Sequence, residues 1–215
     1  MIKNIIILLG LPGSGKGTQG AVLSEELAIP HISTGDILRK MVLEDDKDSK
    51  LLAKYMGEGK LVPSDLVNQL VKRFILSDAC KDGCILDGYP RTLEQAEYFI
   101  ENIDANISTI FFDVPDEVAT KRILGRIACA SCNRLYNEYF DKPKKEGVCD
   151  ECGSKEFAAR SDDDEDTIVA RLEEYRKNTL PMIEYYKEKG RFFTVHGGES
   201  KKKVTEEVAS IVKKI

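Results

Sequence analysis

The feature that most constrains the fold is a glycine-rich loop that directly follows an apolar run. Residues 5–9 read Ile-Ile-Ile-Leu-Leu, and the lack of polar alternation is typical of a parallel strand buried on both faces. The next residues, 10–16, fit the Gly-x4-Gly-Lys pattern of a phosphate-binding loop. Glycines let backbone N–H groups converge on an anion, and Lys16 adds a positive charge. The order strand, loop, helix predicts an α/β fold.

The loop departs from the general pattern directly after Lys16. The pattern has Ser or Thr at that position, whereas here Gly17 intervenes and Thr18 follows. A simple glycine-rich turn between a strand and a helix is the competing interpretation. The buried strand before the loop and the helical pattern after it, through about Leu27, favour a phosphate site.

Further short apolar runs alternate with helical patterns along the chain. The runs lie at 30–33, 84–87, 109–113 and 191–195, and helical patterns lie at 37–42, 64–76, 118–124, 167–175 and 201–215. Residues 44–62 are polar and are broken by Gly57 and Gly59. Alternation of strands and helices predicts a parallel sheet whose ligand lies at the carboxyl ends of the strands.

Charge and hydropathy exclude several classes of protein. The formal net charge of −5 over 215 residues argues against sequence-independent binding to nucleic acid, which needs a basic surplus. A chain without an apolar run of 18 residues is not expected to span a membrane. The apolar N-terminus is short and runs into the glycine loop without a signal-peptide cleavage site, so we expect a cytoplasmic protein.

Four of the six cysteines form two Cys-x-x-Cys pairs, Cys129 with Cys132 and Cys149 with Cys152. Two such pairs are typical of a tetrahedral Zn²⁺ site closed by four thiolates. Disulfides in a secreted protein are the alternative, but the reducing cytosol favours metal binding. From about residue 125 to 163, glycine, lysine, cysteine and aromatic residues replace aliphatic periodicity. This predicts a small insert stabilised by turns and a metal, in which zinc stabilises rather than reacts.

Several sequence blocks resemble the nucleoside monophosphate kinases, and adenylate kinases in particular. They are the loop Gly10–Thr18, Ser33–Asp36 with Arg39, Asp87–Arg91 with Gln95, Arg122 with Gly125 and Arg126, and finally Arg160 and Arg171 around an acidic segment. The insert with four cysteines resembles the zinc-bearing lid of the long bacterial-type adenylate kinases. The resemblance covers essentially the whole chain.

The resemblance implies a P-loop NTPase-type parallel sheet flanked by helices, with an AMP-binding flap and a zinc-containing lid insert. Residues 1–32, 63–124 and 164–215 would form the core, residues 33–62 the AMP-binding flap and residues 125–163 the lid. The implied reaction is reversible phosphoryl transfer from Mg-ATP to AMP, giving two ADP. The implied protein is a monomer with no nucleic-acid or membrane partner.

The resemblance also assigns the site residues. Those implied for ATP are Gly13, Ser14, Gly15, Lys16, Gly17, Thr18, Arg122, Arg126, Leu135, Tyr136 and Glu199. Those implied for AMP are Thr34, Arg39, Lys60, Leu61, Val62, Gly88, Arg91, Gln95, Arg160 and Arg171. Catalysis would depend on Lys16, Arg91, Arg126, Arg160 and Arg171. Asp87 would hold Mg²⁺ through water, with helix or turn capping as its alternative role.

Other interpretations stay open at this point. A related kinase could prefer another base. Alternatively, a zinc-ribbon binding module could be fused to an NTPase, an idea that receives only slight support from Lys142, Lys144, Lys145, Tyr136, Tyr139 and Phe140. The acidic run 162–166 is interpreted as charge at the start of the following helix and as a hinge. The two histidines, His31 and His196, are interpreted as structural.

Overall fold

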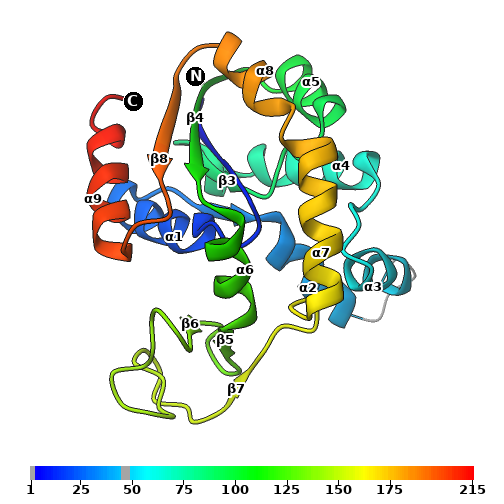
Figure 1. The fold of residues 1–215 in the computed structure, drawn as a ribbon. Helices are drawn as coiled ribbons and strands as arrows, with labels where there is room; N and C mark the ends of the chain where they lie inside the picture. The colour runs from blue at the N-terminus through cyan, green and yellow to red at the C-terminus, as the bar shows by residue number, and fades with distance from the viewer. Residues whose placement is uncertain (1–2, 45–48) are drawn as a thin grey trace.

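A parallel sheet of five strands forms the centre of the described structure (Figure 1). The computed structural model describes residues 3–44 and 49–215, so residues 1–2 of the predicted core and residues 45–48 of the predicted flap lie outside the described residues. The strand order is β2 (His31–Ser33), β3 (Cys84–Asp87), β1 (Lys3–Gly10), β4 (Ala105–Asp113) and β8 (Phe192–His196). All four neighbouring pairs run parallel, so their carboxyl ends meet at one edge.

The central strand β1 explains why its sequence is apolar without alternation. Ile5, Ile7 and Leu9 belong to the hydrophobic cluster on one face of the sheet, whereas Ile6 and Leu8 belong to the cluster on the other. Successive side chains of a strand point to opposite faces, so both faces of β1 are covered. All five side chains are at most 3% exposed. The predicted α/β fold with a parallel sheet is confirmed.

Helices cover both faces of the sheet (Figure 1). One face packs against α1 (Lys16–Leu27) and α9 (Lys201–Val212), through Leu23, Val204 and Val208 among others. The other packs against α2 (Thr34–Leu43), α3 (Ser49–Gly57), α4 (Ser64–Ile75), α5 (Leu93–Asn102) and α8 (Met182–Glu188). A short 3-10 helix, η1 (Asp78–Cys80), leads into β3.

Two helices connect the core to the lid. α6 (Asp116–Leu124) ends where the lid begins, and α7 (Glu165–Glu174) starts where the lid ends. They pack together through Ile123, Ile168 and Leu172, and α7 continues into the π-helical turn η2 (Tyr175–Thr179). The lid therefore extends from the core on two adjacent helix ends (Figure 1).

The lid contains a small antiparallel sheet of its own in the order β6 (Leu135–Asn137), β5 (Arg126–Cys129) and β7 (Phe157–Ala158). Its buried residues are Cys129, Tyr136 and Cys149, with Ile127 and Phe157 packed against them. The sequence predicted a segment with few buried aliphatic side chains, and among the described residues Ile127 is the one aliphatic member of this cluster.

Most predicted elements appear, with differences at their ends. The sequence pattern did not reveal α3, α5 and α8, and β4 is longer than the predicted run 109–113. The pattern did not predict α3 because this helix buries a single large apolar side chain, Leu52, within a polar segment. Among the described residues, no helix is long and apolar enough to span a bilayer.

Candidate active site

The phosphate loop turns sharply between β1 and α1 at its glycines. Gly13 and Gly15 have φ angles of +80° and +92°, which side-chain-bearing residues rarely adopt. A Cβ atom on Gly13 would lie only 2.4 Å from the carbonyl oxygen of Ala119 in α6. Gly13 is therefore required both by its backbone conformation and by the close approach of α6.

Lys16 folds back over this loop. Its Nζ donates to the carbonyl oxygens of Gly10 and Leu11, both at 2.7 Å, and to Ser14 Oγ at 3.1 Å. Burial, opposed by Asp87 and reinforced by Arg91 and other arginines, lowers the pKa of Lys16 to about 8. The ammonium group is thus held inside the loop, at the start of α1, where helix N–H groups also favour an anion.

Asp87 ends β3 beside this loop. Its Oδ2 lies 3.6 Å from His31 Nε2, and a Cβ atom on Gly17 would lie 3.3 Å from the same oxygen. Burial acts to raise the pKa of Asp87, but the neighbouring His31 imidazole and the charge of Lys16 hold it below its usual value. A charged carboxylate next to a phosphate loop is a ligand type that Mg²⁺ prefers. His31, interpreted from sequence as structural, is thus a neighbour of the candidate magnesium residue.

A second hollow, the flap pocket, lies between the flap, the core and the start of α7. Its walls include most of the residues that the family resemblance assigns to AMP: Thr34, Arg39, Lys60, Leu61, Val62, Gly88, Arg91, Gln95 and Arg171. The remaining walls are Gly35, Leu38, Met56, Gly59, Val67 and Asp162, which the sequence did not single out as site residues. The pocket combines an apolar wall with arginines, as a base and a phosphate would require.

Gln95 and Arg91 are fixed in this pocket by a hydrogen-bond network that is buried at Tyr89 and exposed at Arg91. Gln95, 2% exposed, accepts from the backbone N–H of Arg91 at 2.8 Å. Arg91 Nε donates to the carbonyl oxygen of Gly88 at 2.8 Å. Below them, the buried Tyr89 hydroxyl hydrogen-bonds Asn68 Oδ1 at 2.7 Å. The hydroxyl also lies 3.2 Å from the carbonyl oxygen of Gln95, so α4 and the turn after β3 are joined directly beneath the pocket.

Arginines from the lid and α7 are gathered by a buried carboxylate. Asp163, with a side chain 2% exposed, accepts from Arg126 Nε at 2.7 Å and Arg126 Nη2 at 2.5 Å. It also accepts from Arg171 Nη1 at 3.0 Å. This two-point contact of a guanidinium with a carboxylate fixes the orientation of both groups. Asp163 is therefore a positioning residue for two of the predicted catalytic arginines.

A second carboxylate joins the flap to the lid. Asp36 in α2 lies 2.5 Å from Arg39 Nη2 and 2.9 Å from Arg160 Nη2. Arg39 also reaches Asp162 Oδ2 at 3.4 Å. Burial acts to raise the pKa of Asp36, but Arg39 and Arg160 hold it below its usual value. Burial and neighbouring arginines lower the pKa of Arg160 to about 10, so the cluster concentrates positive charge.

Arg122 and Glu199 meet on the other side of the phosphate loop. Arg122 donates from Nη1 to the carbonyl oxygen of Gly197 at 2.7 Å and from Nη2 to that of Glu199 at 3.2 Å. The ring centroid of Phe140 lies 5.9 Å from Arg122 Cζ, within cation–π range. The structure thus brings together two residues that the resemblance assigns to the ATP side.

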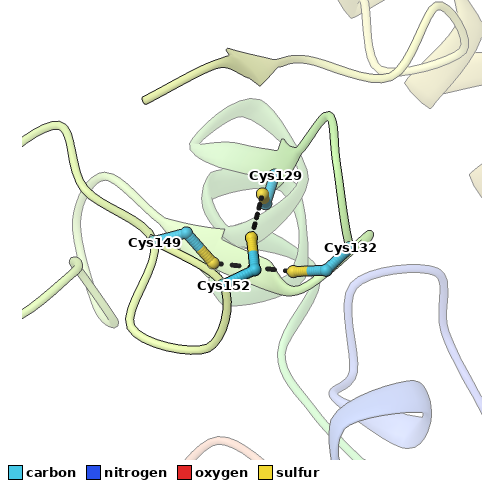
Figure 2. Close-up of side chains that lie close together, drawn as sticks. All are labelled: Cys129, Cys132, Cys149 and Cys152. Atoms are coloured by element: carbon cyan, nitrogen blue, oxygen red, sulfur yellow. Dashed lines mark hydrogen bonds between the residues drawn. The ribbon is translucent and has the colours of Figure 1, made fainter. Parts of the chain in front are cut away.

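The four lid cysteines converge, as Figure 2 shows. Their Sγ atoms all lie within 4.8 Å of one another, with Cys129 and Cys152 at 3.5 Å and Cys132 and Cys149 at 3.6 Å. Four thiolates around Zn²⁺, each about 2.3 Å from the metal, would be separated by about 3.8 Å. The cluster therefore fits a tetrahedral zinc ion with all four positions filled by protein.

Leu135 and Tyr136 lie on β6 beside this cluster. The Tyr136 side chain is 4% exposed, packs against Phe157 and points to Cys149. Its ring is therefore part of the interior of the lid. A contact of the Leu135 and Tyr136 backbone with a nucleotide, which the resemblance implies, stays a prediction.

Comparison with known proteins agrees with this geometry. A sequence model of the family described as Adenylate kinase matches residues 8–191. A relative from Rickettsia africae (strain ESF-5), named Adenylate kinase, is 46% identical over 209 residues, which is 97% of this chain and 99% of the relative. The chain belongs to the adenylate kinase family. Further relatives with the same name come from Rickettsia akari (strain Hartford) and Rickettsia prowazekii (strain Madrid E). They are 45% and 42% identical, again over 97% of this chain and 99% of the relative.

One sequence interpretation of this adenylate kinase family member is confirmed for only part of the segment. The acidic run 162–166 was expected to charge the start of α7, and Asp164 does so by accepting from the backbone N–H of Thr167 at 2.9 Å. Asp162 and Asp163 instead turn inward and pair with arginines. Two of their partners, Arg39 and Arg126, are far away in sequence, so the local charge pattern could not separate the two kinds of aspartate.

Proposed function

We propose that this protein catalyses reversible transfer of the γ-phosphoryl group of Mg-ATP to AMP, giving two ADP. One observation carries the proposal: the phosphate loop and the flap pocket share a group of arginines. Arg91 and Arg171 line the flap pocket, and their charges also lower the pKa of Lys16 in the loop. Two anionic ligands, one on each side, would therefore present their phosphates to the same cations.

The chemistry needs positioning and charge rather than a general base. An oxygen of the acceptor phosphate attacks the γ-phosphorus, and the bond from that phosphorus to the bridging oxygen of the leaving ADP breaks. The acceptor oxygen is already ionised, so no proton has to move. Lys16 and the amides of residues 13–18 would hold the donor phosphates, while Arg126, Arg160 and Arg171 would stabilise charge on the transferring group.

The flap pocket would bind AMP. Arg39 and Arg91 are suited to the phosphate as two-point donors, and Gln95 and Thr34 are suited to the polar edge of the base. The backbone of residues 60–62 would contact the base and sugar. Arg122, with the backbone of Glu199 and of residues 135–136, would border the donor adenine.

The two metals would have separate roles. Mg²⁺ bound with ATP supplies charge neutralisation at the phosphates, and Asp87 would hold it through water. The four cysteines would hold Zn²⁺, which keeps the lid folded and leaves no position open for catalysis. The lid presents Arg126 and Arg160, so an ordered lid orients these arginines and excludes water as a competing acceptor.

The same reasoning extends to domains and compartment. We propose a core formed by residues 1–32, 63–124 and 164–215, an AMP-binding flap at 33–62 and a lid at 125–163. Metal binding needs the four lid cysteines to stay reduced, so we place the protein in the cytoplasm. The family resemblance further implies that it acts as a monomer.

A nucleotide panel tests the proposal. Mg-ATP is combined with AMP, GMP, CMP or UMP, and diphosphate formation is measured, with Mg-GTP as an alternative donor. We expect AMP with ATP to give at least about 100-fold higher kcat/KM than the other pairs, because buried polar groups reject a mismatched base. Equal use of another monophosphate would establish a related kinase. An absence of diphosphate with every acceptor would overturn the proposed reaction.

A further inference from the structure

Tyr136 occupies an unusual position between the lid sheet and the cysteine cluster. It lies in β6, its side chain is 4% exposed, and its ring meets Phe157 edge-on at a centroid distance of 5.6 Å. A buried tyrosine hydroxyl needs a hydrogen-bond partner, since an unpaired one costs stability. Both hydrogen-bond partners of Tyr136 lie in the turn that carries the second cysteine pair, Cys149–Cys152.

The hydroxyl makes two contacts with adjacent residues. It donates to Cys149 Sγ at 3.5 Å and accepts from the backbone N–H of Asp150 at 2.7 Å. The first contact reaches a sulfur of the proposed zinc site, and the second fixes the backbone of the turn that carries it. One side chain of the sheet is thus bonded to both the ligand atom and its supporting turn.

The two cysteine pairs are built alike. The carbonyl oxygen of Cys129 accepts from Asn133 N at 2.9 Å, and the carbonyl oxygen of Cys149 accepts from Gly153 N at 2.9 Å. Asn133 and Gly153 have φ angles of +59° and +73°, so each pair ends in a left-handed residue. The local geometry of the two turns is therefore the same.

Their attachment to the lid sheet differs. Cys129 is the last residue of β5, where it is paired with Phe157 of β7. Cys149 and Cys152 lie in turns outside the named strands. An ion pair from Arg134 to Glu151, at 3.1 Å, connects the two cysteine turns. Its side chains are 41% and 58% exposed, and such exposed pairs contribute little to stability. The hydroxyl of Tyr136 supplies a buried link.

We propose that Tyr136 supports the metal site. Its hydroxyl holds the Cys149–Cys152 turn in the geometry that metal binding needs, and it donates a hydrogen bond to the Cys149 thiolate. The inference rests on the proposed zinc site. Groups that orient a metal ligand raise metal affinity, and losing one typically weakens binding by about 10- to 100-fold. Tyr136 would thereby make zinc binding tight and zinc release slow.

Tyr136→Phe isolates the hydroxyl. Phenylalanine keeps the ring that packs on Phe157 and lies 5.8 Å from Arg134 Cζ, and it removes the donor to Cys149 and the acceptor for Asp150. The matched control is Tyr139→Phe, which removes a hydroxyl from a lid tyrosine that is 57% exposed.

The test measures zinc affinity by competition with a chromophoric chelator, and the rate of zinc release to EDTA, on the full-length zinc-loaded proteins. We expect Tyr136→Phe to bind Zn²⁺ about 10- to 100-fold more weakly and to release it correspondingly faster, with Tyr139→Phe unchanged. In the Co²⁺-substituted protein, Tyr136→Phe should shift the thiolate-to-metal charge-transfer band. An unchanged affinity, release rate and spectrum would overturn the role of Tyr136.

Melting temperatures separate this role from simple packing. The zinc-loaded variant should melt below the zinc-loaded wild type, and the two should melt together after zinc removal, because the hydroxyl acts through the metal site. An equal decrease in both forms would overturn the proposal in favour of packing. If the wild type itself bound no zinc, the proposed metal site would be wrong, and the role of Tyr136 with it.

Discussion

The central sheet and the lid present active-site residues by different physical means. In the sheet, strands such as β1 are buried on both faces, and the phosphate loop extends from one of them. In the lid, the buried cluster is two cysteines and one tyrosine, with two further apolar side chains beside them. Burial of aliphatic surface stabilises the first region, and thiolates with a metal would stabilise the second.

The difference shows how one chain can support two parts of the same site by different physical means. Lys16 follows the loop after β1 and Asp87 ends β3, so both are attached to strands that are buried in the core. Arg126 begins the short strand β5, which ends at Cys129 in the sulfur cluster. A compact sulfur cluster that holds a metal would keep that strand in place without an aliphatic core. The predictions below test this division, from the largest expected effect to the smallest.

Cys149→Ser should have the largest effect, and it should be confined to the lid. Loss of one thiolate removes most of the metal-binding free energy, which is on the order of 10 kcal/mol in isolated zinc peptides. Calorimetry should show a new lid transition at much lower temperature, while turnover measured in the cold falls far less. Loss of turnover with an unchanged melting profile would contradict a stabilising role for the metal.

Ile110→Ala should have the complementary effect on the core. Ile110 is fully buried in β4, and a cavity at such a site costs about 2–5 kcal/mol of unfolding free energy. Chemical denaturation should show the whole core losing stability, with zinc affinity equal to that of the wild type. A decrease in zinc affinity would mean that the two regions are not independent.

Asp163→Asn should lower catalysis without unfolding either region. The substitution removes the charge that orients Arg126 and Arg171, so we expect kcat to fall about 100-fold, or about 2.7 kcal/mol. Steady-state kinetics with Mg-ATP and AMP measure the change. The control Asp166→Asn, on the exposed side of the same acidic run, should stay within about twofold of the wild type.

ATP affinity should weaken above pH 8 because of Lys16. With its pKa lowered to about 8, Lys16 is charged below that pH and loses its charge above it. A bound triphosphate favours the charged form, so binding takes up a proton, and affinity should be about tenfold lower at pH 9 than at pH 7. Calorimetry in two buffers of different ionisation enthalpy would detect the uptake.

Lys16→Arg provides the control for that pH dependence. Arginine stays charged throughout this range, so any remaining binding should be flat between pH 7 and 9. A wild-type affinity that did not change over the same range would show that Lys16 titrates elsewhere.

Lys201→Ala should have the smallest effect. Lys201 Nζ, at the start of α9, lies 2.7 Å from Asp141 Oδ2 in the lid, and both side chains are more than 40% exposed. Such a pair contributes less than about 1 kcal/mol, and salt screens it. We expect kcat to change by no more than about twofold, and the difference to disappear in high salt. Lys202→Ala, one residue further along, should leave kcat unchanged.

The strands were predictable from sequence because burial on both faces leaves a local signature. The run 5–9 needed no knowledge of its neighbours to be assigned as a buried strand. α3 was not predictable in the same way, because Leu52 is its one large buried apolar side chain and its other residues follow no strong pattern. α5 and α8 were not predicted either, although they bury Phe99 and Tyr186, so the amount of buried apolar surface alone does not make an element recognisable from its local pattern.

The site was predictable only in part, for a different reason. The loop and the cysteine pairs carry their chemistry in short spacings, so the sequence suffices to recognise them. Asp162 and Asp163 have the same local setting as Asp164, and only the folded chain separates those that face arginines from the one that caps α7. The placement of His31 beside Asp87 likewise depends on the pairing of β2 with β3.

The carboxylates among the arginines of the site balance part of their positive charge. Asp36 and Asp163 accept hydrogen bonds from the guanidinium groups of Arg160 and Arg126. A phosphate entering this cluster would meet guanidinium groups that carboxylates already orient, rather than bare cations surrounded by water. Part of the positive charge is already balanced by a carboxylate, so the free energy gained by binding a phosphate there would be moderate. That balance suits a reaction that must bind and release nucleotides equally well on both sides of its equilibrium.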